Sequence, residues 1–246
     1  AVLDTHAGRG AYDLSAETPN RTGEWRAGVG RLLPAEAAPG AAAGPLGPWL
    51  SLLREAGFPP RYPGSPLLLR ALLREADRLV LCEKHPEEAA ALRAAIGRDR
   101  RVAVHARDGW EALGALTPFP ERRGLVLIDP PFEQPGEFER IVEACRLLRH
   151  RFRAGVVAAW YPVKHRAPVR AFEAGLREAG LTDILAAEFC LREPTDPARL
   201  NGCGVMVMNP PFGFADEARA ILGALLPVLS DGEAGAGAEV KVVADE

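Results

Sequence analysis

The chain has 246 residues, 48% of them hydrophobic, which is enough for one large packed domain or for a domain with an insertion. Its formal net charge of −3 is not the overall basic balance expected of a nucleic-acid binder. The sequence contains no apolar run of about 18 residues and no signal peptide at its start, so we expect a cytoplasmic protein without a membrane partner.

The four cysteines and five histidines do not have the spacing of a metal site. No C-x-x-C pair occurs among the cysteines, and no H-x-x-x-H or H-E-x-x-H pair among the histidines. We therefore expect reduced thiols, no disulfide framework and no bound metal.

The chain opens on a strand-like segment, residues 1–4, that leads into a small-residue turn ending at Gly10. A strand that runs into a glycine turn is typical of a nucleotide site. The phosphate-loop motif is absent, and G-x-G-x-x-G fails because Asp13 stands at the third glycine position. An NAD-dependent oxidoreductase is therefore only a distant alternative.

Residues 19–63 differ in composition from their surroundings and predict an inserted helical subdomain. A helical pattern opens at residues 21–25, a Pro/Ala/Gly-rich loop covers residues 34–48, and an apolar helix follows at residues 49–56. The predicted division of the chain is a core of residues 1–18 and 64–230, this insertion, and an acidic C-terminal segment of residues 231–246.

From Pro63 onward, predicted helices and strands alternate regularly. The predicted helices end near residues 76, 97, 116, 149, 179 and 226. The predicted strands cover residues 78–83, 102–105, 125–129, 154–160, 184–190 and 204–209. This alternation predicts an α/β fold with a doubly wound, mostly parallel sheet, whose last two strands form an antiparallel edge hairpin.

The strand at residues 125–128 runs straight into Asp129, Pro130, Pro131 and Phe132. The two prolines end the strand because they cannot donate to a ladder, which leaves a carboxylate, exposed carbonyls and a flat ring at its carboxyl end. Such acceptors can hold the protons of the exocyclic amino group of a planar base, and an aromatic ring can stack on the base. The alternative is a strand-ending turn with a core Phe, and the tetrapeptide alone does not decide between them.

Polar groups follow four consecutive strands of the predicted sheet, at residues 4–8, at Glu83, at Asp108-Gly109 and at Asp129. Ligands of such sheets bind outside the carboxyl ends of the strands. An acid after the second strand suits a ribose diol, and one after the third suits an adenine amino group. Each acid by itself is more often a cap or a turn former, but the four in order indicate a ligand site.

Four arginines surround His150, namely Arg146, Arg149, Arg151 and Arg153. They form either a phosphate-contacting patch or the solvated end of a helix. We favour the solvated helix end, because charge clusters usually have that role.

These residues resemble the class I S-adenosylmethionine-dependent methyltransferases, and in detail the bacterial large-subunit (23S) ribosomal RNA adenine-N6 methyltransferases of the RlmJ type. The resemblance covers residues 3 to about 212 and has eight motifs in the family's order. The motifs lie at residues 3–10, 21–24, 62–66, 83–86, 108–109, 123–133, 160–162 and 209–212.

The resemblance implies a Rossmann-like fold, S-adenosylmethionine as cofactor and 23S ribosomal RNA as partner. We also expect a monomer. The cofactor-site positions that it implies are His6, Gly8, Ser65, Glu83, Asp108, Gly109 and Asp129. The catalytic positions are Asp129, Pro130, Pro131 and Phe132, with Asp129 as acceptor for the target amine. The family usually has Tyr where Phe132 stands, so the ring face is kept and a hydroxyl is lost.

The family has a segment of a few dozen residues before the first strand, so we expect this chain to be part of a longer protein. Asn209-Pro-Pro-Phe212 also fits amino methyltransferases, but its place after the edge hairpin predicts a structural turn. Alternative functions are a DNA adenine or protein-glutamine amino methyltransferase, or a non-catalytic RNA- or cofactor-binding relative.

Overall fold

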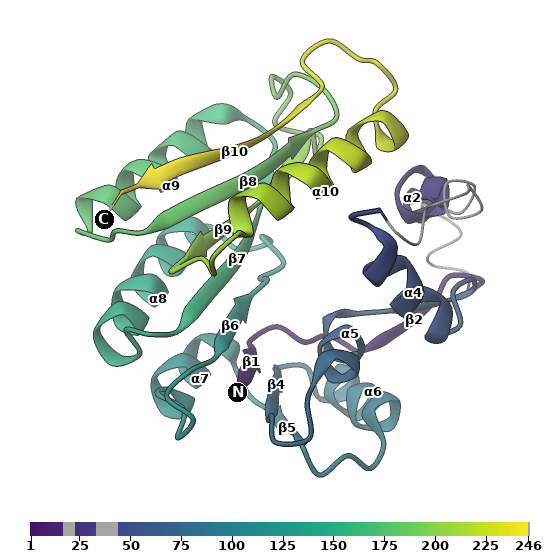
Figure 1. Ribbon diagram of the computed structural model, residues 1–246, viewed down its shortest axis with the longest axis vertical. Helices are drawn as coiled ribbons and strands as arrows, with labels where there is room; N and C mark the ends of the chain where they lie inside the picture. Colours follow the sequence, from purple (N-terminus) through teal and green to yellow (C-terminus); the bar gives the residue numbers. More distant parts are fainter. Residues whose placement is uncertain (17–22, 33–43, 246) are drawn as a thin grey trace.

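The computed structural model describes residues 1–16, 23–32 and 44–245, and within them an eight-stranded sheet carries helices on both faces (Figure 1). The strand order is β10-β8-β9-β7-β6-β1-β4-β5. The strands are β1 (Val2–Asp4), β4 (Leu79–Glu83), β5 (Val102–Ala106), β6 (Leu125–Ile128), β7 (Val156–Val163), β8 (Ile184–Cys190), β9 (Gly202–Met208) and β10 (Gly237–Ala244). Five neighbouring strands, β7, β6, β1, β4 and β5, run parallel to one another. Strand β9 is antiparallel to both of its neighbours, β7 and β8, and β10 is antiparallel to β8. The predicted doubly wound sheet with an antiparallel edge is confirmed.

Helices bury both faces of the parallel strands, which explains their nearly continuous apolar sequences. The helices are α2 (Glu24–Ala27), α4 (Gly47–Glu55), α5 (Ser65–Leu72), α6 (Pro86–Ile96), α7 (Gly109–Leu116), α8 (Glu137–Arg151), α9 (Arg166–Glu178) and α10 (Phe214–Leu229), with a 3-10 turn at Val29–Arg31. In Figure 1, α8 and α9 lie behind the sheet and α10 lies in front. Helices α7 to α9 share the main core with β6 and β7, and α6 packs in a second cluster with Leu79 and Leu81 of β4. In the described part of the chain, no helix has the length and apolarity needed to cross a bilayer.

Three features differ from the sequence prediction. Strands β2 (Ala11–Asp13) and β3 (Arg61–Pro63) pair with each other and bring the two ends of the insertion together. Helix α5 ends at Leu72 instead of near residue 76, because Leu73 is extended and the Asp77 carboxylate accepts the Arg74 amide in a turn. The acidic segment contains β10, whose Lys241 pairs with the buried Glu188 of β8.

The described part of the insertion has its own small apolar cluster. Leu32, Leu50 and Leu53 are buried in it, and Leu225 and Val228 of α10 pack against it. In Figure 1, α2 and α4 accordingly lie near the end of α10. The predicted start of the insertion and most of its predicted loop, residues 17–22 and 33–43, lie outside the described residues. The division of the chain into core and insertion therefore stays a prediction.

The sheet topology determines where a ligand site forms. After β1 the chain adds β4 and β5 on one side, and then crosses back to add β6 and β7 on the other side of β1. In such sheets ligands bind at this switch point, outside the carboxyl ends of the strands. Strand β7 also extends past its neighbour, because Ile128 at the end of β6 pairs with Ala159 and β7 continues to Val163.

Candidate active site

A cavity of about 470 Å³ lies at the carboxyl ends of β1, β4, β5 and β6, within the range of about 300–1,000 Å³ typical of ligand pockets. The predicted site residues that line it are His6, Gly8, Glu83, Asp108, Gly109, Asp129 and Pro131. They come from four strand ends that are distant in sequence, so the parallel topology brings them together.

Three predicted site residues do not line this cavity. The Ser65 hydroxyl, at the start of α5, instead donates a hydrogen bond of 2.7 Å to Oδ2 of Asp4. Pro130 is buried. The Phe132 ring packs edge-on against Phe138 and Trp160, with centroid separations of 5.0 and 5.8 Å. Phe132 also has a left-handed backbone (φ 54°), a strained conformation for a bulky residue that is frequent at functional sites.

The turn after β1 carries a buried acid and a neutral histidine. Asp4 is fully buried, and burial raises the pKa of its carboxyl to about 6 although Ser65 and the His6 amide donate to it. Burial lowers the pKa of His6 to about 4. The Thr5 hydroxyl donates to the Leu127 carbonyl at 2.9 Å, so we assign His6 Nδ1 as the donor in its 2.7 Å contact with Thr5 Oγ1. His6 Nε2 is then left as an acceptor.

The carboxylate of Glu83 joins the loops that follow β1 and β4. Its Oε2 accepts the Gly8 amide at 2.9 Å, and its Oε1 accepts the His85 amide at 2.8 Å. Each carboxylate oxygen has a second lone pair, so Glu83 can still accept a hydrogen bond from a hydroxyl donor in the cavity. Gly8 has a left-handed φ of 60°, and a Cβ there would lie 2.7 Å from the Tyr12 hydroxyl. The turn therefore requires glycine at this position.

Asp108 is the N-cap residue of α7, and this helix forms another wall of the cavity. Its Oδ1 accepts the Trp110 amide, and its Oδ2 pairs with Lys84 at 3.1 Å. Burial raises the pKa of Asp108, but the Lys84 ammonium and the Trp110 amide outweigh burial and hold that pKa below its ordinary value. A Cβ on Gly109 would overlap the Thr5 carbonyl oxygen, so only glycine lets α7 approach the β1 turn this closely.

An aromatic wall connects α7 with α8. The Trp110 ring lies edge-on to His6, with centroids 5.2 Å apart, and the Arg140 guanidinium lies over Trp110 at 4.7 Å. A guanidinium over a tryptophan face is an attractive cation–π contact. This wall was not predicted, because the helix that carries Arg140 is distant in sequence from Trp110.

Asp129 extends beyond the end of β6 into the cavity. The side chain is exposed to solvent, yet the protein around the cavity desolvates the carboxyl enough to raise the pKa of Asp129 to about 6. Within the described ranges, no residue donates a hydrogen bond to the Asp129 carboxylate or to the Pro130 carbonyl. The Asp129 carboxylate, which lines the cavity, is therefore available to a ligand.

The cavity is rich in carboxylates. Its lining contains the acids Glu83, Asp108, Asp129, Glu133 and Glu137, and the cations Lys84 and Arg140. Such a site favours a ligand with positive charge and several hydrogen-bond donors over a phosphate group.

The second Pro-Pro-Phe turn lies at the opposite end of the strands from the cavity. Strand β9 is antiparallel to β7, and its last residue, Met208, pairs with Val157 near the start of β7. The side-chain nitrogen of Asn209 (Nδ2) donates to the carbonyls of Arg153 and Gly155, at 2.9 and 2.7 Å. The structure thus places Asn209 in a turn away from the cavity, as the sequence predicted.

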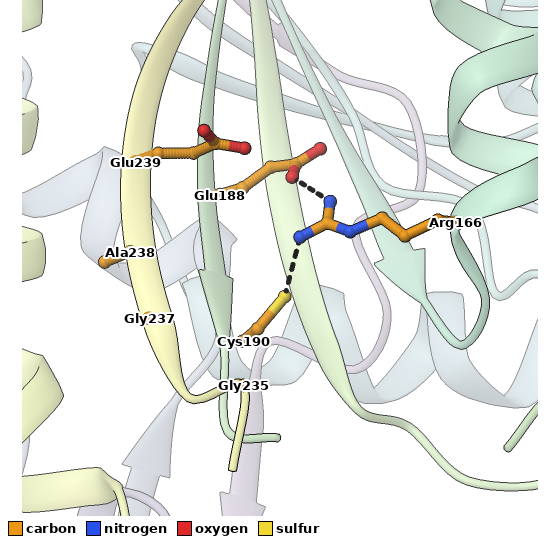
Figure 2. Close-up of a pocket in the computed structure, with 7 residues that line it drawn as sticks. All are labelled: Arg166, Glu188, Cys190, Gly235, Gly237, Ala238 and Glu239. Atoms are coloured by element: carbon orange, nitrogen blue, oxygen red, sulfur yellow. Dashed lines mark hydrogen bonds and ion pairs between the residues drawn. The ribbon is translucent and has the colours of Figure 1, made fainter. Parts of the chain in front are cut away.

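A separate cavity of about 280 Å³ lies between β8 and β10 (Figure 2). In Figure 2 the Arg166 guanidinium reaches between Glu188 and the Cys190 thiol. Glu188 is buried and also accepts hydrogen bonds from Tyr161 and Lys241. A buried charge is tolerated when it has a partner of opposite charge, and Glu188 has such partners in Arg166 and Lys241. We therefore explain this cluster as part of the packing of the sheet edge.

The strand order, the four acidic strand ends and the cavity at the switch point define a Rossmann-like class I methyltransferase. The family model described as "Ribosomal RNA large subunit methyltransferase D, RlmJ" matches residues 1–242. The chain belongs to this family.

Individual relatives agree with the family match. The chain is 36% identical over 228 residues to ribosomal RNA large subunit methyltransferase J of Escherichia coli K12, covering 89% of this chain and 78% of that protein. It is 35% identical over 229 residues to the protein of that name from Haemophilus influenzae Rd, with the same coverage of 89% and 78%. A crystal structure of a Legionella pneumophila protein is similar in fold, with a TM-score of 0.85 and 31% identity over 98% of this chain and 87% of that one.

Several cavity residues were missed by the sequence analysis, namely Thr5, Lys84, His85, Trp110, Glu133, Gln134, Glu137 and Arg140. Four of the eight, namely Thr5, Lys84, Trp110 and Glu133, are next in sequence to a predicted residue, so a rule that includes such neighbours finds these four. Glu137 and Arg140 lie in the first turns of α8, and only the packing of α8 beside the cavity identifies them.

Proposed function

We propose that this protein uses S-adenosylmethionine to methylate the N6 amine of an adenine in 23S ribosomal RNA. The observation that carries the proposal is Asp129, whose carboxylate faces a carboxylate-rich cavity in a chain of the RlmJ family. An enzyme that acts on ribosomal RNA works in the cytoplasm, and we propose that location for this one.

The residues present fit the proposed cofactor. S-adenosylmethionine, when bound, supplies a methyl group on a positively charged sulfur. The cofactor also carries an ammonium group, ribose hydroxyls and an adenine amine, all of which donate hydrogen bonds, and the cavity offers Glu83, Asp108 and Asp129 as acceptors. Glu83 would hold the ribose hydroxyls and Asp108 the adenine amine, while His6 and Gly8 would form the floor. The buried Asp4 adds negative charge behind this floor.

Asp129 and the Pro130 carbonyl would hold the two protons of the target amine. An exocyclic amine is a poor nucleophile because its lone pair is delocalised into the ring, and two acceptors favour the geometry in which the lone pair is released. Correct placement of two reacting groups can lower a barrier by roughly 7–11 kcal/mol, so we assign these residues mainly a positioning role. Because the pKa of Asp129 is raised to about 6, its carboxylate can also take up the proton that the amine loses.

The target base would enter the cavity without its phosphates. A carboxylate-rich lining repels the backbone of RNA, so the base must leave its stack, at a cost of a few kcal/mol. An unpaired or loop adenine is therefore the expected target. Phe132, held by Phe138 and Trp160, would present its remaining surface to the base.

The proposal is tested by offering alternative acceptors to the enzyme. The protein is incubated with labelled methyl donor and, separately, unmodified 23S ribosomal RNA, DNA and a protein extract. We expect label in the RNA alone, recovered as N6-methyladenosine after digestion and mass spectrometry. Label found only in DNA or protein would contradict the proposed substrate, and no label with bound cofactor would support a non-catalytic relative.

A further inference from the structure

A pocket of about 460 Å³ lies on the side of the molecule opposite the cavity, where α8 and α9 end. We call it the arginine pocket; its lining is Arg146, Arg149, His150, Arg153 and residues 179–181, and among these residues none is acidic. Cations in the last turn of a helix interact favourably with its dipole, which accounts for Arg149 and His150. It does not account for Arg153, which lies beyond the end of α8.

Arg149 is held in this pocket by uncharged partners. Its guanidinium donates to Asn209 Oδ1 and to Thr182 Oγ1, both at 2.8 Å. These acceptors fix the side chain without neutralising it. Arg146 pairs with Glu143 at 3.1 Å, but both side chains are exposed, so an incoming anion can replace this carboxylate easily. The pocket is therefore a cationic surface in which Arg149 is held in place.

The Asn209-Pro-Pro-Phe212 turn is joined to this pocket by hydrogen bonds of Asn209. Asn209 has a left-handed backbone (φ 52°), accepts from Arg149, and donates to the carbonyls of Arg153 and Gly155. Phe212 follows three residues later, so the chain reaches at most about 11 Å from Asn209. Its ring is fully exposed to solvent, with a relative exposure of 108%.

We propose that the arginine pocket and Phe212 bind a single-stranded segment of RNA. A cationic groove beside an exposed aromatic ring is the arrangement that binds single strands, since the cations contact phosphates and each base can stack on the ring. Arg149 and Arg153 contact the phosphates, and Phe212 stacks on an unpaired base. The inference rests on the proposed function for the identity of the RNA.

The position of this surface determines which part of the RNA it meets. The pocket lies beside the start of β7, whereas Asp129 lies past the residues of β6 that pair with Val156–Ala159. These four paired residues alone span about 13 Å, so the base on Phe212 is a different nucleotide from the methylated adenine. Binding at the arginine pocket and Phe212 therefore favours an RNA long enough to reach from the cavity to the opposite end of the strands.

The test compares RNA binding by two variants with that of matched controls. Binding of a fluorescent single-stranded fragment of 23S ribosomal RNA is measured by anisotropy over a range of salt concentrations. Phe212→Ala should weaken binding about tenfold without changing the salt dependence. Arg153→Gln should weaken binding at low salt and reduce the slope of log K against log salt by about 0.7, the value for one phosphate contact on a single strand.

The controls are Leu72→Ala, an exposed apolar residue at the end of α5, and Arg170→Gln, an exposed cation on α9. Both should bind RNA as the parent does, and thermal melts should show that all four variants are folded. If both test variants bind within twofold of the parent, the inference is wrong. If the variants bind weakly but the parent methylates no ribosomal RNA, the second surface stands and the proposed function fails. If the parent methylates RNA and Phe212→Ala leaves its KM unchanged, the second surface is contradicted and the proposed function stands.

Discussion

The Gly8 amide donates a hydrogen bond of 2.9 Å to the Glu83 carboxylate, although 75 residues separate the two positions in the chain. This bond connects the first strand end of the sheet with the second and places both beside the cavity. Its acceptor also receives the His85 amide, so a single carboxylate organises two loops. The shape of the cavity floor depends on this carboxylate.

Glu83→Gln should loosen the floor of the cavity. The amide side chain keeps one oxygen acceptor, so either Gly8 or His85 loses its partner, and an unmade buried hydrogen bond costs about 1–3 kcal/mol. We expect a lower free energy of unfolding and weaker cofactor binding. Urea denaturation and calorimetric titration with S-adenosylmethionine measure the two effects. Unchanged cofactor affinity would show that Glu83 does not hold this ligand.

Gly109→Ala should destabilise the protein, because the new Cβ overlaps the Thr5 carbonyl oxygen and forces α7 away from the β1 turn. Overpacking of this kind costs roughly 1–3 kcal/mol. The matched control is Gly223→Ala in α10, where an added Cβ meets no atom within 4 Å. The control should be neutral or stabilising by up to about 1 kcal/mol, because alanine is the better helix former. Equal effects of the two changes on urea denaturation would contradict the close approach at Gly109.

Ser65→Ala should act through Asp4. The Ser65 hydroxyl lowers the pKa of the buried Asp4 carboxyl, so its removal should raise that pKa further above about 6 and make Asp4 more often protonated near neutral pH. If the Asp4 charge favours the cationic cofactor, affinity for S-adenosylmethionine should fall most strongly between about pH 6 and pH 7. Titrations at several pH values measure this, with Ser51→Ala in α4 as control. A loss that is the same at every pH would indicate a packing effect alone.

Asp129→Asn should increase stability above pH 6. The pKa of Asp129 is raised from 3.8 to about 6, so the folded state favours the protonated carboxyl. The contribution of this group to the free energy of unfolding is therefore fully present below about pH 4 and is lost as the pH rises through 6. An asparagine avoids that loss, by about 1 kcal/mol or less because water in the cavity screens the charge. Denaturation curves at pH 4 and pH 8 should differ between parent and variant only at pH 8.

The fold was largely predictable because its signals are local. Apolar runs such as Leu125–Ile128 end at turn residues, and each is followed by a helical pattern, so the alternation and the parallel sheet follow from the sequence. Strand β10 was missed because its acidic and glycine-rich surroundings resemble a tail, while its pairing with β8 depends on contacts distant in sequence. The short β2–β3 pair depends on such contacts too.

The site residues that directly follow a strand could be predicted from the sequence. Glu83, Asp108 and Asp129 were identified from their positions after apolar runs, and the structure brings them to one cavity. Arg140 was not found, since its contact with Trp110 depends on how α8 packs against α7. Ser65 was expected at the cofactor, yet its hydroxyl contacts Asp4, which a motif comparison does not reveal.

The central claim, that Asp129 accepts the target amine in methyl transfer to ribosomal RNA, is tested most directly by single-turnover kinetics of Asp129→Asn. Cofactor and RNA binding are measured on the same preparation, and Glu178→Gln, an exposed acid on α9, serves as control. We predict that the control transfers methyl groups at the parent rate, whereas Asp129→Asn binds both ligands and loses at least about a hundredfold in rate, in the range seen when a positioned proton acceptor is removed. A transfer rate in Asp129→Asn within a fewfold of the parent rate would contradict the claim.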